Sequence, residues 1–128
     1  MKASIIQALE NAKNAKAFAA SRPLVKINDS IINIRTATQK SGSKYWFDIT
    51  PTFYTKAQFF LFACGNASTV YVFPSTVLQQ LLKDASLGGE KQVPNFTIFS
   101  DIHKLEPAGA GGARSSIRQY LNAYSLIP

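Results

Sequence analysis

Cysteine and histidine are almost absent from this sequence, which has one residue of each, Cys64 and His103. A structural zinc site needs about four such ligands, so we expect no metal site of this kind. A single thiol also excludes an internal disulfide, and disulfides are typical of small secreted domains. A Cys64–His103 dyad is conceivable, but a thiol at the end of an apolar strand is usually an inert packing group.

Long hydrophobic runs are missing as well. No stretch approaches the roughly 18 consecutive apolar residues that a membrane span requires. Near the N-terminus, Glu10, Asn11 and Lys13 interrupt the apolar residues, which a secretory signal peptide does not tolerate. We therefore predict a cytoplasmic protein with no membrane partner.

Motifs for phosphate cradling or catalysis are also lacking. No GxxxxGK[ST] loop occurs, and the glycines at 109–112 follow no strand–turn–helix pattern. A metal-dependent nuclease groups two or three carboxylates on adjacent strands. The acids of this chain, Asp29 and Asp48 among them, are instead widely spaced in the sequence. The sequence therefore predicts no catalytic residues, no metal and no cofactor.

What the chain does have is the composition of a folded core. Apolar residues make up 46% of its 128 residues and charged residues 16%, which suits one domain, 1–128. Periodicity predicts an α/β (α+β) fold: a central mixed sheet of about five strands, flanked by helices at the N-terminus, in the middle and at the C-terminus. The predicted helices are 2–20, 77–85 and a segment after 115–116; the predicted strands are 24–27, 31–36, 44–49, 59–64, 70–73 and 95–99; 39–43 and 107–113 are predicted loops.

Positive charge dominates the ionisable residues. Lysine and arginine outnumber the acids 14 to 7, which gives a net charge of +7 and a pI near 9.7. Such a surplus attracts polyanions, of which nucleic acid is the commonest inside cells. Several cations gather around the loop predicted at 39–43, although an ordinary solvated loop is the alternative interpretation. The predicted contacts to phosphates are Arg35, Lys40, Ser41, Ser43, Lys44 and Lys56.

Part of the chain resembles a known family. Residues 60–65 (Phe-Leu-Phe-Ala-Cys-Gly) and 70–75 (Val-Tyr-Val-Phe-Pro-Ser) follow a hairpin strand at 31–36 and an aromatic strand at 44–49. This pattern, over about 24–85, resembles the core of the restriction-endonuclease-like PD-(D/E)xK superfamily. The resemblance implies a nuclease fold and a DNA partner. The acid-x-Lys position of the family falls on Asn33-Ile34-Arg35, and no acid precedes it near 22–24.

These departures imply an active site that has been lost. Asn33 is a poor substitute for a metal-binding carboxylate, and Arg35 suits phosphate clamping better than proton handling. We therefore predict a catalytically silent DNA-binding accessory or specificity domain of a restriction or repair system. One alternative is an active Mg²⁺-dependent endonuclease, similar to Holliday-junction resolvases, that uses Asp29 or Asp48 with Asn33 and Arg35. Another is a protein-interaction module. The sequence is compatible with a homo-oligomer and with a larger restriction complex.

Overall fold

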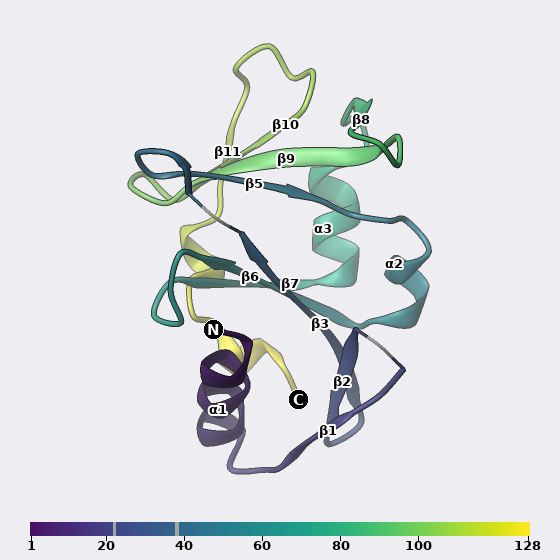
Figure 1. The fold of residues 1–128 in the computed structure, drawn as a ribbon, viewed down its shortest axis with the longest axis vertical. Helices are drawn as coiled ribbons and strands as arrows, with labels where there is room; N and C mark the ends of the chain where they lie inside the picture. Colours follow the sequence, from purple (N-terminus) through teal and green to yellow (C-terminus); the bar gives the residue numbers. More distant parts are fainter. Residues whose placement is uncertain (22, 38) are drawn as a thin grey trace.

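Two stacked β-sheets make up the fold, with the helices against their faces and edges (Figure 1). The computed structural model describes residues 1–21, 23–37 and 39–128, with backbone only for 39–41. The first sheet has, in spatial order, β1 (Ala17–Ala19), β2 (Leu24–Ile27), β3 (Ser30–Ala37), β6 (Phe59–Cys64) and β7 (Val70–Pro74). The second has β11 (Ser115–Ser116), β10 (Lys104–Pro107), β9 (Val93–Phe99), β5 (Lys44–Asp48) and β4 (Gln39–Ser41), with β8 (Leu87–Gly88) paired to β9. The helices are α1 (Lys2–Lys13), α2 (Phe53–Lys56) and α3 (Ser75–Leu81).

The first sheet is the predicted central mixed sheet of five strands, which is confirmed. Its strands β3 and β6 run parallel, and the other neighbouring pairs are antiparallel. The continuous apolar run at 59–64 predicts a strand covered on both faces, and all residues of β6 are buried. The sequence does not predict the second sheet, which takes the aromatic strand β5.

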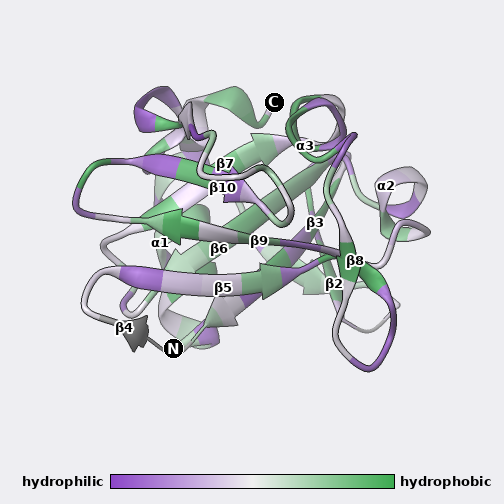
Figure 2. Cartoon of the chain, turned by 90° about the horizontal axis from the view of Figure 1, so that it is seen from above, coloured by the Kyte–Doolittle hydropathy of each residue, from purple (hydrophilic) through white to green (hydrophobic). Residues whose placement is uncertain are grey.

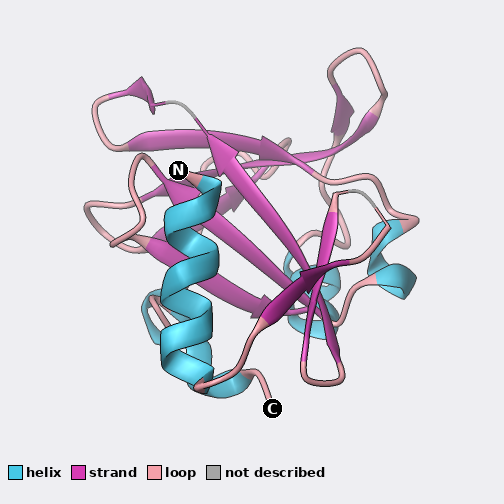
Figure 3. Cartoon of the chain, turned by 60° about the horizontal axis from the view of Figure 1, so that its bottom comes forward, coloured by secondary structure: helices cyan, strands magenta, loops and turns pink. Residues whose placement is uncertain are grey.

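Each face of the first sheet packs against a different layer. One face meets Ile5 and Leu9 of α1 and Ile127 near the C-terminus (Figure 3). The other face meets the inner face of the second sheet, and Phe62 of β6 lies at the centre of this contact. Its ring centroid is 4.8 Å from that of Phe47 and 5.2 Å from that of Phe96, which come from β5 and β9. Aromatic side chains therefore join the two sheets.

The first helix is shorter than predicted. The prediction of 2–20 is wrong after Lys13, because Asn14 takes the left-handed conformation with φ 48° and ends the helix. Asparagine tolerates this conformation better than most residues. The chain then turns into β1, where the Ala17 N–H donates to Glu10 Oε2 at 2.8 Å. The alanines that favour a helix at 15–20 thus lie in a turn and in an edge strand.

The C-terminal segment differs most from the prediction. In place of an α-helix after 115–116, β11 pairs with β10, and short 3₁₀ turns follow at Arg118–Tyr120 and Tyr124–Leu126. The Ile117 N–H donates to the His103 carbonyl at 2.8 Å, and the Asn122 N–H donates to the Val70 carbonyl at 2.6 Å. Tertiary partners therefore take backbone groups that a helix would pair internally.

The segments at 39–43 and 77–85 differ less from the prediction. Residues 39–43, predicted as a loop, contain β4, and Gly42 with φ 57° lies in the turn to β5. The helix predicted at 77–85 begins at Ser75 and ends at Leu81. The Ser75 hydroxyl donates to the Tyr54 carbonyl at 2.8 Å in place of capping the helix. Within the part of the chain that the structure describes, none of the helices has the length and apolarity that a membrane crossing demands.

Candidate nucleic-acid interface

The second sheet has one face turned away from the core. Tyr45 and Phe47 pack inward, so the alternation of side chains along β5 turns Lys44 and Trp46 to the opposite side. The register of β9 with its two neighbours continues this surface. It places Phe99 between Lys44 and Lys104, and Thr97 between Trp46 and Glu106. We call this surface the outer face: it is formed by Lys44, Trp46, Thr97, Phe99, Lys104 and Glu106, together with Arg114, which lies over the Phe99 ring.

No described helix covers the outer face. In Figure 2, β5, β9 and β10 lie toward the viewer, and the helices lie behind or beside them. Lys44, Trp46 and Lys104 are exposed. An uncovered sheet face of this kind is accessible to an extended ligand.

Cations surround the ring at the centre of the outer face. The Arg114 guanidinium lies 3.9 Å from the Phe99 ring centroid, and Lys44 Nζ lies 5.8 Å from it. Cation–π attraction and contact with the aliphatic stems explain why Phe99 is only 8% exposed. Arg114 Nε also donates to Glu106 Oε1 at 2.9 Å, which holds the guanidinium against the sheet. Three cations against one carboxylate leave this surface with net positive charge.

Trp46 is the exposed aromatic residue of the outer face. The residue is 38% exposed, so part of its large surface is open to solvent. The indole Nε1 donates to Asn95 Oδ1 at 3.3 Å, which orients the ring over the sheet. Trp46 is also the only tryptophan of the chain.

Arg35, which the sequence predicts as a phosphate contact, lies in an ion pair. Its guanidinium donates to the Asp48 carbonyl through Nη1 and to Asp48 Oδ1 through Nη2, both at 2.9 Å. The two side chains are only 30% and 20% exposed. Asp48 therefore balances the charge of Arg35, a pairing that the spacing of the two residues in the sequence does not reveal.

The other predicted phosphate contacts are not all in one place. Lys44 lies on the outer face, and Ser43 precedes it in the turn, where its carbonyl accepts from the Ser100 N–H at 3.0 Å. Lys56 belongs to α2, beside the stacked sheets, with Nζ 5.7 Å from the Phe53 ring (Figure 1). The side chains of Lys40 and Ser41 lie outside the described residues. The structure instead adds Lys104 and Arg114, which follow Lys44 by about 60 and 70 residues.

The two acids of the nuclease alternative are not brought together. Asp29 lies in the turn between β2 and β3, six residues before Arg35 along an extended strand. At a rise of about 3.3 Å per residue, it is roughly 20 Å from the Arg35–Asp48 pair. Among the described residues, no group of three or more His, Cys, Asp or Glu side chains is placed to hold a metal ion.

Cys64 and His103 do not pair with each other through a hydrogen bond. His103 Nδ1 lies 2.8 Å from the Tyr71 hydroxyl. Cys64 is 2% exposed, and this burial raises the pKa of its thiol to about 12. The thiolate is the nucleophilic form, so Cys64 is a packing group at neutral pH.

A pocket of about 460 Å³ lies next to the Arg35–Asp48 pair. Its lining includes Asn33, Arg35, Thr36, Thr50, Phe53 and Lys91. Asn33 is 0% exposed, and neither atom of its amide has a hydrogen-bond partner among the described residues. A buried group of this kind costs about 1–3 kcal/mol of stability, so it marks a position that packing alone does not explain.

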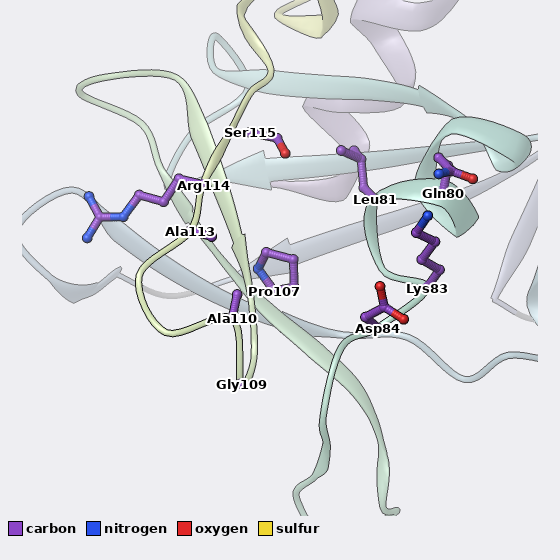
Figure 4. Close-up of a pocket in the computed structure, with 10 residues that line it drawn as sticks. All are labelled: Gln80, Leu81, Lys83, Asp84, Pro107, Gly109, Ala110, Ala113, Arg114 and Ser115. Atoms are coloured by element: carbon purple, nitrogen blue, oxygen red, sulfur yellow. The ribbon is translucent and has the colours of Figure 1, made fainter.

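A smaller pocket, of about 280 Å³, lies between the end of α3 and the loop after β10 (Figure 4). Lys83 and Asp84 lie on one side of it, and Arg114 extends away from them toward the outer face. Its charged groups do not converge on one point, and we assign it no ligand.

Comparisons with protein-family models, with curated proteins and with solved structures gave no match for this chain. The resemblance to the restriction-endonuclease-like superfamily therefore stays a prediction.

Proposed function

We propose that the protein binds single-stranded DNA along the outer face of its second sheet, and that it is catalytically silent. The observation that carries this proposal is the arrangement of Lys44, Lys104 and Arg114 around Phe99, next to the exposed ring of Trp46. Proteins that bind single strands combine cations that follow the phosphates with aromatic rings on which bases stack. The net charge of +7 adds long-range attraction for the same ligand.

Two features favour a single strand over a duplex. The outer face is a sheet surface, with neither a helix nor an arm among the described residues that would enter a groove. Trp46 offers a ring for stacking, and only an unpaired base has a free face to stack on it. This proposal agrees with the accessory role in a restriction or repair system that the resemblance implies.

Trp46 makes the proposal directly testable, because the chain has no other tryptophan. Titration of a twelve-nucleotide oligothymidylate should quench the tryptophan fluorescence at low salt. If Lys44, Lys104 and Arg114 each neutralise one phosphate, the log–log slope of affinity against salt should be about −2 for a single strand. A duplex of the same length should bind more weakly. Binding that leaves the fluorescence unchanged, or that does not depend on salt, would contradict the proposal.

We also expect no cleavage of plasmid, junction or single-stranded DNA above background with Mg²⁺ or Mn²⁺. The reason is that Asp29 and Asp48 are far apart and that Asp48 is paired with Arg35. The measurement is a gel assay in which the Asp48→Ala variant is run beside the unmodified protein. Turnover that disappears in this variant would favour the endonuclease alternative.

A further inference from the structure

The pocket beside Asn33 has the features of a small-molecule site. Its volume of about 460 Å³ falls in the usual range for ligand pockets. Arg35 and Lys91 contribute positive charge, and no carboxylate is among the described residues that line it. Thr36 and Thr50 also line the pocket. The lining therefore favours an anion, and the pocket is larger than a phosphate group alone requires.

The remaining lining residues indicate what else the ligand carries. Phe53 and Pro23 contribute apolar surface, which suits the face of a planar ring. The amide of Asn33 has a donor and an acceptor side by side, and neither has a partner among the described residues. The same pair of atoms is complementary to the edge of adenine, where an amino donor adjoins a ring nitrogen acceptor. A phosphate joined to adenine would thus use each type of group in the lining.

We propose that this pocket binds an adenine nucleotide. Its phosphate lies against Arg35 and Lys91, and its base meets the Asn33 amide. Asp48 takes two of the five N–H groups of Arg35, which fixes the guanidinium beside the pocket. Because Asn33 is closed off from water in the free protein, the lining side chains must move apart when the base binds.

The nucleotide has two possible sources, a free mononucleotide or one unit of a DNA strand. Asp48 and Trp46 are neighbours on the same side of β5, so a strand on the outer face passes close to Arg35. Only the DNA strand as a source rests on the proposed function. Comparing the affinities of oligoadenylate and oligothymidylate distinguishes the two sources, because a strand that inserts an adenine binds more tightly than one that has none.

The test titrates AMP, GMP, adenosine and inorganic phosphate into the ¹⁵N-labelled protein and follows the amide signals of β3. AMP should bind at least tenfold more tightly than GMP or phosphate, and more tightly than adenosine. Asn33→Leu keeps the branched shape of the side chain but has no hydrogen-bonding group, and it should lower the AMP affinity at least tenfold. Lys91→Ala should weaken AMP and leave adenosine unchanged.

Stability provides the second readout. Asn33→Leu removes an amide that has no partner, so its melting temperature should equal or exceed that of the unmodified protein. Loss of AMP binding in a variant of undiminished stability supports the proposal. Absence of AMP binding at millimolar concentration, or unchanged AMP binding by Asn33→Leu, overturns it. Quenching of Trp46 by oligothymidylate should be the same in this variant, so a failure of the pocket is distinguishable from a failure of the outer face.

Discussion

Replacing Phe62 by alanine should lower the free energy of unfolding by about 3–5 kcal/mol, the usual cost of removing a large buried ring. Phe62 is 0% exposed, and its ring meets Phe47, Phe73 and Phe96 within 6 Å between centroids. Because these partners belong to both sheets, the cavity would open in the layer that joins them. Urea denaturation followed by circular dichroism measures the loss.

Phe18→Ala is the matched control for this variant. Phe18 is 63% exposed on the edge strand β1, and the same deletion there should change the free energy of unfolding by no more than about 0.5 kcal/mol. If Phe62→Ala cost as little as Phe18→Ala, the stacking of the two sheets at this position would be refuted.

Removing the cations of the outer face should weaken DNA binding strongly. Changing Lys44, Lys104 and Arg114 to glutamine removes three charges from the outer face and keeps much of the stems that cover Phe99. The log–log slope of affinity against salt should become shallower by about 2, and the affinity at low salt should fall roughly a hundredfold or more. Fluorescence anisotropy of a labelled oligothymidylate over a series of salt concentrations measures both.

The control for this variant removes the same charge elsewhere. The three lysines Lys16, Lys26 and Lys83 are exposed, and they lie before β1, in β2 and in the turn after α3. Their change to glutamine should reduce the affinity by much less and leave the slope nearly unchanged. Equal losses in the two triple variants would mean that binding depends on net charge and not on the outer face.

Local patterns predict those parts of the fold that neighbouring residues determine. The uninterrupted apolar run at 59–64 suffices to predict β6 as a central strand, because no polar residue marks a solvated face. The spacing of Ile117, Tyr120, Leu121 and Tyr124 is equally regular, yet their segment is not an α-helix. Tyr120 packs on Phe73 with 5.1 Å between ring centroids, and Leu121 forms a β-bridge with Tyr71. These contacts join distant parts of the chain, so periodicity cannot reveal them.

The candidate site likewise has one part that local sequence predicts and another that depends on long-range contacts. Lys44 is recognisable in the sequence because it adjoins a polar turn and an aromatic strand. Lys104 and Arg114 join it only through the pairing of β5, β9 and β10, which depends on long-range register. Arg35 and Asp48 likewise meet because the end of β3 lies beside the end of β5. The positions of the cations therefore follow from sheet topology, which no short motif encodes.

The edge at β1 bears on how the molecule behaves at high concentration. An exposed edge strand invites the strand of another copy to pair with it, which is a common route to aggregation. β1 has only three residues, and Glu10 takes the Ala17 N–H that would otherwise be open to such pairing. Lys26 of the neighbouring strand β2 lies opposite Phe18 in the register and adds a positive charge near this edge. The early end of α1 at Asn14 thus lets Glu10 cover a backbone N–H of this edge. Fewer backbone groups are then open to another strand, which disfavours edge-to-edge aggregation despite the exposed ring of Phe18.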